Sequence, residues 1–319
     1  MQELENYFNM MFEGKEPATL YAPIAYTLKQ SGKRLRPQMV YHVVEMFGGD
    51  LSQAKYVAAA FEMLHNFTLI HDDIMDKAPI RRGQPTVYKK WNTNSAILSG
   101  DALAIMAFQQ LLKLNVDEKT ILKISEVFAT CTLEICEGQQ YDMDFETQEE
   151  VSIDEYIRMI YLKTAVMFAG CLKSGAILAG ADEESQEALF QVGINLGIAF
   201  QLVDDFLDVY ADTTVFGKSL GGDIRDNKKT YLYLKAMQDA SPEEKPLLKQ
   251  CYESTEMDFE EKFASVKGFY EKLQIAEKTS QAVHDYMTKS FAELDKVHVG
   301  EDQKKKIREV IANLEQRSK

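Results

Sequence analysis

Hydrophobic positions recur along the chain with a helical period. Long segments place apolar residues at i, i+3, i+4 and i+7, and only seven prolines and seventeen glycines interrupt 319 residues. The pattern leaves little room for strands and predicts an all-α fold. Several expected helices exceed twenty residues, which favours a large bundle. The expected helices cover residues 18–30, 36–47, 51–77, 94–114, 117–145, 152–180, 184–211, 228–239, 243–275 and 277–315.

The apolar content is concentrated in residues 94–211, which we expect to form the bundle centre. From about Asp239 onward the charge density rises, which is typical of peripheral helices with solvated faces. No linker, low-complexity tract or tandem repeat interrupts the chain. We therefore expect one domain spanning residues 1–319.

A turn of three carboxylates stands out in the segment FEMLHNFTLIHDDIMDKAPIRRG, residues 61–83. Asp72 and Asp76 lie about 40° apart on a helix, and His65 lies about 20° from Asp72. The surrounding helix is apolar on nearly all faces and should be buried. Two carboxylates about 4 Å apart in such a setting repel by about 4 kcal/mol at an effective dielectric of 20. A compensating cation is therefore expected, and Mg²⁺ prefers such oxygen ligands.

The same triplet spacing recurs in FQLVDDFLD. Asp204, Asp205 and Asp208 repeat the i, i+1, i+4 pattern of Asp72, Asp73 and Asp76, again on an apolar helix, and Gln201 shares their face. Two such triplets about 130 residues apart are difficult to explain as solvated surface. We expect the two helices to face each other across a cavity and hold metal ions between them.

Composition limits the classes of partner. The net charge of −14 and the pI near 4.9 argue against a nucleic-acid partner. The four cysteines show no CxxC spacing and are expected to be reduced core thiols. The N-terminus lacks the features of a signal peptide, and we expect no apolar run to reach membrane-spanning length. These features predict a soluble cytoplasmic protein without stable membrane insertion.

Basic residues occur beside the acidic motifs. Arg81 and Arg82 follow the first triplet, and planar guanidinium groups recognise phosphate bidentately. Single lysines are more often surface charges, but Lys163 lies in the apolar run IYLKTAVMFAG and needs a partner or a pKa shift. The remaining basic residues lie in SGKRLRP (Lys33, Arg34 and Arg36) and in GKSLGGDIRDNKKT (Lys218 and Lys228).

In this order, GKRLRP, HDDIMD with RRG, KT, FQLVDDFLD and GK with DNK resemble the trans-type isoprenyl diphosphate synthases, also called polyprenyl synthetases. The resemblance covers residues 30–235. It implies one all-α domain around a deep central cavity, usually in a homodimer. It also implies condensation of isopentenyl diphosphate with an allylic diphosphate (dimethylallyl, geranyl or farnesyl) and release of diphosphate.

The resemblance assigns a role to each matching residue. Asp72 and Asp76 would coordinate two Mg²⁺ ions and Asp204 a third, with Mn²⁺ as an alternative metal. Supporting carboxylates would be Asp73, Asp205, Asp208 and Asp223. The allylic diphosphate would meet Arg81, Lys163, Lys218 and Lys228, and isopentenyl diphosphate would meet Lys33, Arg36, His65 and Arg82. Thr164, Gln201 and the Lys163 carbonyl would face the developing carbocation.

Product length in this family depends on residues one to two turns before the first triplet. Phe67 and Thr68 occupy those positions, and Phe67 lies about 7.5 Å along the helix axis from Asp72. A bulky ring there resembles short-chain synthases that make products of fifteen to twenty carbons. The alternative interpretation of Phe67 is an ordinary core residue.

Rival functions remain for comparison. A terpene cyclase usually replaces the second triplet, and a non-catalytic synthase subunit typically loses one, whereas this chain keeps both. A di-iron bundle is suggested by Glu62 and His65 at i, i+3, but it needs a second ExxH pair and the sequence has none. These comparisons favour the synthase.

Overall fold

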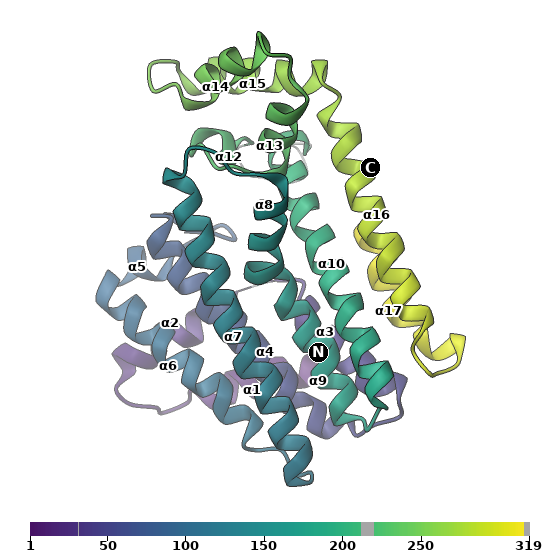
Figure 1. The fold of residues 1–319 in the computed structure, drawn as a ribbon. Helices are drawn as coiled ribbons and strands as arrows, with labels where there is room; N and C mark the ends of the chain where they lie inside the picture. The colour runs from purple at the N-terminus through teal and green to yellow at the C-terminus, as the bar shows by residue number, and fades with distance from the viewer. Residues whose placement is uncertain (31, 212–219, 316–319) are drawn as a thin grey trace. The chain divides into compact units, whose positions relative to one another are not determined.

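The computed structural model describes residues 1–30, 32–211 and 220–315 (Figure 1). The chain divides into two compact units. Unit 1 comprises Met1–Thr132, Gly170–Glu187 and His298–Lys304, and unit 2 comprises Leu133–Ala169, Ala188–Val297 and Lys305–Lys319. Helices dominate the described residues of both units, which confirms the all-α prediction. That the chain is one domain stays a prediction.

Unit 1 is built around α4 (Leu51–Met75), which packs against α3 (Leu35–Met46) and α6 (Thr93–Leu111). The alanine run Ala58–Ala60 is fully buried in α4, and such small side chains allow the neighbouring helices to approach closely. A short hairpin of β1 (Ile80–Arg81) and β2 (Gln84–Pro85) follows α4. The other helices of this part are α1 (Gln2–Met11), α2 (Ala18–Lys29) and α5 (Val87–Lys90).

Unit 2 places α13 (Tyr231–Asp239) against α8 (Ile153–Ile160), α14 (Glu244–Glu253), α15 (Phe259–Lys272) and α16 (Ile275–Asp295). A π-helical turn, η1 (Tyr161–Ala165), continues α8, and a short α12 (Gly222–Arg225) contacts α15. The remaining helices each contribute residues to both units: α7 (Glu118–Thr147), α9 (Val166–Leu178), α10 (Glu183–Tyr210) and α17 (Glu301–Glu315).

Two of the expected helices are each divided into two shorter helices in the structure. The expected helix over 243–275 is divided into α14 and α15, because the Asp258 carboxylate accepts the backbone N–H of Glu261 at 2.9 Å and starts a new helix. The expected helix over 277–315 is divided into α16 and α17 around a turn in which Val297 is buried. The expected set also omitted α1, whose Leu4 and Phe8 are both buried.

One apolar stretch is longer than the sequence interpretation allowed. Residues Ile153–Leu178 could cross a membrane by length and composition, so the expectation that no run reaches that length was wrong. However, 78% of its most apolar window is buried inside the protein. Core helices of globular proteins pass the same test of length and composition.

Candidate active site

The first aspartate triplet lies in the last turn of α4 and at its C-cap. Asp73 is 4% exposed, and its Oδ1 accepts a hydrogen bond from Arg81 Nε at 2.6 Å. Burial raises the pKa of Asp73, and the Arg81 charge only partly opposes this. Asp72 is half-buried and Asp76 is exposed. Asp73 is therefore held inside the protein, whereas the other two carboxylates are accessible to a ligand.

A cluster of arginines surrounds His65 in unit 1. Burial lowers the pKa of His65 well below its usual value, and the charges of Arg36, Arg82, Arg81 and Arg34 lower it further. The Arg82 guanidinium lies only 3.2 Å from the position that a Cβ on Gly32 would occupy. Its buried NH1 atom has no hydrogen-bond partner among the described residues. Gathered cations with a buried unpaired donor fit an anionic ligand.

Arg34 differs from its neighbours in SGKRLRP. Its side chain is 6% exposed and lies between the carboxylates of Glu62 and Glu5, with a further hydrogen bond to the Leu28 carbonyl. Lys33 is exposed on the same loop. Arg34 is thus a structural ion-pair residue, consistent with its absence from the expected ligand set. Because Glu62 is occupied by this ion pair, the structure also argues against the di-iron alternative.

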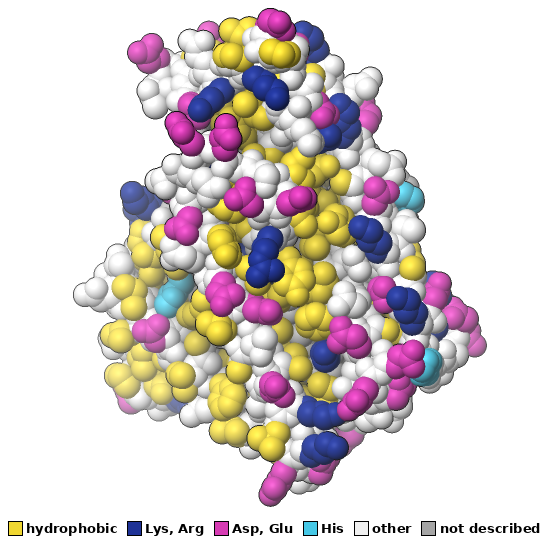
Figure 2. Space-filling view, in the orientation of Figure 1, with side chains coloured by type: hydrophobic (Ala, Val, Ile, Leu, Met, Phe, Trp, Pro, Cys, Tyr) yellow, Lys and Arg dark blue, Asp and Glu magenta, His cyan; other side chains and the backbone are white. Residues whose placement is uncertain are grey.

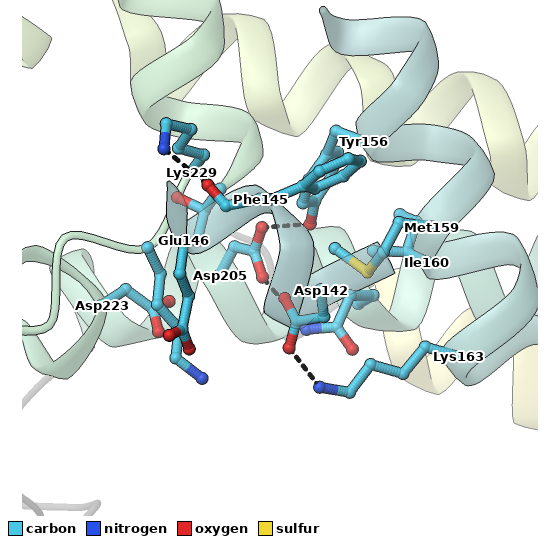
Figure 3. A pocket seen from close by; sticks show the side chains of 13 residues that line it. Asp142, Phe145, Glu146, Tyr156, Met159, Ile160, Lys163, Asp205, Asp223 and Lys229 are labelled. Atoms are coloured by element: carbon cyan, nitrogen blue, oxygen red, sulfur yellow. Dashed lines mark hydrogen bonds and ion pairs between the residues drawn. The ribbon is translucent and has the colours of Figure 1, made fainter. Parts of the chain in front are cut away.

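The second triplet contains one deeply buried carboxylate. Asp205 is 4% exposed and accepts a hydrogen bond from the Tyr156 hydroxyl (Figure 3). It also accepts from the Gln201 amide at 3.1 Å and from the Tyr231 backbone N–H at 3.3 Å. Burial raises the pKa of Asp205 to about 7, and the neighbouring Asp204 charge adds to this. Asp204 itself is exposed. The two triplets therefore share a pattern. Asp73 and Asp205 are enclosed, whereas the preceding aspartates, Asp72 and Asp204, are accessible.

Asp208 and Asp223 extend this acidic group. The Asp208 carboxylate accepts the backbone N–H of Gly222 at 3.2 Å and of Asp223 at 3.0 Å. The pKa of Asp223 is raised well above its usual value by burial, followed by the charges of Asp205 and Asp208, while Lys228 opposes the shift. Carboxylates that repel one another and offer only oxygen ligands are suited to a hard divalent cation such as Mg²⁺.

Lys163 and Thr164 lie on the π-helical turn η1. A Cβ on Gly138 of α7 would lie 2.2 Å from the Lys163 backbone nitrogen, so glycine permits the close approach of this turn. Lys163 Nζ pairs with the Asp142 carboxylate, which confirms that this lysine needs a partner. Thr164 Oγ1 donates to Gln201 Oε1 at 3.0 Å. Such π-helical turns are frequent at functional sites.

A pocket of about 110 Å³ in unit 2 is lined by Lys163, Asp205 and Asp223 among other residues (Figure 3). The sequence interpretation omitted eight of its thirteen lining residues, of which Asp142 and Tyr156 make hydrogen bonds or ion pairs to predicted site residues. Asp142 could have been found as the anion that Lys163 requires, in the segment GQQYDMDF. No sequence signal distinguishes Tyr156 from an ordinary core aromatic. The lining is Asp142, Phe145, Glu146, Tyr156, Met159, Ile160, Lys163, Gln201, Asp205, Asp223, Lys228, Lys229 and Thr230.

The other residues predicted from the sequence are Phe67, Thr68 and Lys218. Phe67 and Thr68 are half-buried on α4, and the Phe67 ring lies edge-to-face with His71 at a centroid distance of 4.8 Å. Lys218 lies outside the described residues. That the two triplets face each other across a cavity stays a prediction.

Comparisons with known proteins agree with these features. A family model described as polyprenyl synthetase matches residues 17–270. The geranylgeranyl diphosphate synthase of Methanosarcina mazei is 44% identical over 222 residues, which cover 70% of this chain and 68% of that protein. The geranylfarnesyl diphosphate synthase of Natronomonas pharaonis is 38% identical over 239 residues, covering 70% of each chain.

Solved structures match over nearly the whole chain. A crystal structure of a geranylgeranyl pyrophosphate synthase is similar with a TM-score of 0.93 at 42% identity, covering 99% of this chain and 97% of the other. The geranylgeranyl pyrophosphate synthetase of Pyrococcus horikoshii matches with a TM-score of 0.93 at 31% identity, covering 99% and 95%.

Proposed function

Because the chain belongs to the polyprenyl synthetase family, we propose that it condenses isopentenyl diphosphate with an allylic diphosphate and releases diphosphate. The product is a short-chain all-trans prenyl diphosphate. The arginine cluster around His65 supports this proposal most strongly, because a substrate that keeps its own diphosphate needs a basic site that does not depend on metal ions. In that cluster the buried NH1 donor of Arg82 has no hydrogen-bond partner within the described part of the chain.

The allylic substrate would bind to the acidic triplets and nearby cations. Asp72, Asp76 and Asp204 would hold Mg²⁺, since they are the accessible carboxylates of each triplet. When bound, Mg²⁺ would neutralise the diphosphate and make it a better leaving group. Lys163 and Lys228 of the pocket would attract the same diphosphate, as would Arg81 beside the first triplet and Lys218.

Isopentenyl diphosphate would bind to Lys33, Arg36, Arg82 and His65. The arginines supply bidentate hydrogen bonds to phosphate oxygens. His65 stays neutral near pH 7 because its pKa is depressed. A neutral imidazole can still donate one hydrogen bond from its protonated ring nitrogen to a phosphate oxygen.

Ionisation of the carbon–oxygen bond would leave an allylic cation near Thr164 and Gln201. The Gln201 amide is oriented at both ends, because its oxygen accepts from Thr164 and its nitrogen donates to Asp205. The π-electrons of isopentenyl diphosphate would attack the cation, and the released diphosphate would accept the proton then lost. Exclusion of water by the apolar lining would prevent capture of the cation as an alcohol.

A product of twenty carbons is the finer proposal. It is supported by relatives and matched structures that are named geranylgeranyl diphosphate or pyrophosphate synthases. Phe67, half-buried one turn before the first triplet, would limit the growing tail.

A homodimer is also proposed. Figure 2 shows apolar side chains gathered over α6. The exposed fractions on this helix and its end are 60% for Leu98, 65% for Ile105 and 62% for Leu112. Exposed apolar patches of this kind mark protein interfaces, and a second copy would bury the same face on both partners. Leu98→Glu should give a monomer in light scattering, whereas Leu247→Glu on α14, an equally apolar exposed site, should leave the dimer intact.

The function is tested by incubating purified protein with Mg²⁺, isopentenyl diphosphate and each allylic primer in turn. We expect a prenyl diphosphate product whose length is read by chromatography after dephosphorylation. Absence of condensation with every primer would reject the proposal. Formation of a cyclic hydrocarbon from the allylic substrate alone would favour the terpene cyclase alternative.

A further inference from the structure

The short helix α12 and the turn after it, residues 223–228, carry two side chains of the pocket, Asp223 and Lys228. Its backbone is closed by the Lys228 N–H, which donates to the Asp223 carbonyl at 2.9 Å. Asn227 between them adopts a left-handed conformation with φ of 57°. Asparagine adopts this conformation at lower cost than most non-glycine residues, and neighbouring contacts fix the turn further. The contacts that hold this turn therefore decide where both side chains point.

Tyr252 of α14 contacts the turn through its hydroxyl group. The hydroxyl donates to the Lys228 carbonyl at 2.5 Å and lies 3.4 Å from the Asp223 carbonyl oxygen. Tyr252 is 1% exposed, and its ring stacks on Tyr233 at a centroid distance of 4.0 Å. Burial raises the pKa of Tyr252 well above its usual value, so the hydroxyl remains a donor at neutral pH.

Lys262 of α15 holds the same turn from a second side. Its side chain is nearly buried, and Nζ donates to the Asn227 side-chain oxygen. The ammonium also lies 5.9 Å from the centre of the Tyr252 ring. Close packing is completed at Gly221, where a Cβ would lie 2.4 Å from the Phe263 ring of α15. Figure 1 shows α14 and α15 beside α12 and α13.

We propose that Tyr252 and Lys262 are positioning residues, which fix the turn that presents Asp223 and Lys228 to the metal-bound diphosphate of the allylic substrate. This inference rests on the proposed function. Neither side chain lines the pocket. Their effect passes through the backbone of residues 223–228, because each donates to an atom of that turn. Asp208 also supports this segment, because its carboxylate accepts the backbone N–H groups of Gly222 and Asp223.

Tyr252→Phe separates positioning from folding. The Lys228 carbonyl still accepts the Thr230 N–H at 2.8 Å, so the substitution leaves no buried acceptor without a donor. Loss of one well-aligned hydrogen bond should raise the KM for the allylic diphosphate and the half-saturating Mg²⁺ concentration about 3- to 10-fold. The KM for isopentenyl diphosphate should not change. Tyr233→Phe is the matched control, because it removes a hydroxyl from the partner ring without touching the turn.

Calorimetry with Mg²⁺ and inorganic pyrophosphate provides a readout that does not depend on turnover. Binding should weaken in Tyr252→Phe and in Lys262→Met but not in Tyr233→Phe. If Tyr252→Phe does not fold, Lys262→Met carries the same comparison. Unchanged binding in both variants, or an equal rise in both substrate KM values, would overturn the inference. Weaker pyrophosphate binding in a protein that condenses no substrates would instead reject the proposed function and leave the positioning role standing.

Discussion

Arg81 and Arg82 are adjacent in the chain but contact different parts of unit 1. Arg81 Nε donates to Asp73 of the first triplet at 2.6 Å, whereas the Arg82 guanidinium lies against Gly32 in the loop that carries Lys33. The left-handed conformation of Arg82, with φ of 52°, turns the chain sharply at this point. The two neighbouring guanidinium groups thus have different partners.

This separation predicts different kinetic effects for the two arginines. Arg81→Met should raise the KM for the allylic diphosphate, and Arg82→Met should raise the KM for isopentenyl diphosphate. Each lost charge-assisted interaction should cost about 10- to 100-fold. Steady-state kinetics with one substrate varied at a time provides the measurement. Equal effects of both substitutions on both substrates would contradict the division.

Gly138 should be essential for the geometry of the π-helical turn. Its α-carbon faces the Lys163 backbone, and an added Cβ would lie 2.2 Å from the Lys163 nitrogen. Gly138→Ala should therefore displace Lys163 and Thr164 and lower kcat by about 10- to 100-fold. Gly268→Ala is the control, because apart from its own helical turn no described residue has an atom within 4 Å of that Cβ position, and alanine favours a helix. Similar activity of the two variants would show that the close approach is unimportant.

Phe67 should limit product length. Phe67→Ala removes the ring beside His71 and opens space one turn before Asp72. We expect products at least one isoprene unit longer, detected by chromatography of the dephosphorylated chains. Phe269→Ala on α15 is the control for loss of a half-buried aromatic ring. An unchanged product distribution in Phe67→Ala would identify Phe67 as an ordinary packing residue.

Arg34 and Lys33, both in the segment SGKRLRP, should contribute very differently to the stability of the fold. Arg34→Met leaves the buried Glu62 carboxylate without its cation and should lower the free energy of unfolding by about 3–5 kcal/mol. Lys33→Met alters an exposed side chain and should change stability by less than about 0.5 kcal/mol. Urea unfolding measures both. A small effect of Arg34→Met would contradict the structural role of the ion pair.

Asp205 should make the stability of the metal-free protein pH-dependent. Its folded pKa of about 7 lies above the value of about 4 in an unfolded chain. The folded state therefore binds this proton more tightly, and the resulting stability is lost as the pH rises from about 4 through about 7. Unfolding in a chelator near pH 5.5 and near pH 8 should show this loss in the wild type and less of it in Asp205→Asn. An identical pH dependence of both proteins would refute it.

The helical class and both triplets were readable from the sequence. Periodicity depends on residues close together in the chain, so it predicts a helix before any tertiary contact is known. The boundaries within 243–275 and 277–315 were missed because both segments are highly charged and the breaks depend on one cap and one buried turn.

What the sequence alone determined was which residue types stand together: two aspartate triplets, a basic loop and a lysine in an apolar run. Only the tertiary structure decided which member of each group is enclosed. Asp205 and Asp204 are neighbours, but Tyr156, forty-nine positions from Asp205, helps to enclose Asp205, whereas Asp204 is exposed. Arg34 is a structural ion pair because Glu5 and Glu62 reach it from other helices. Burial and pairing depend on partners distant in sequence, and no local pattern records them.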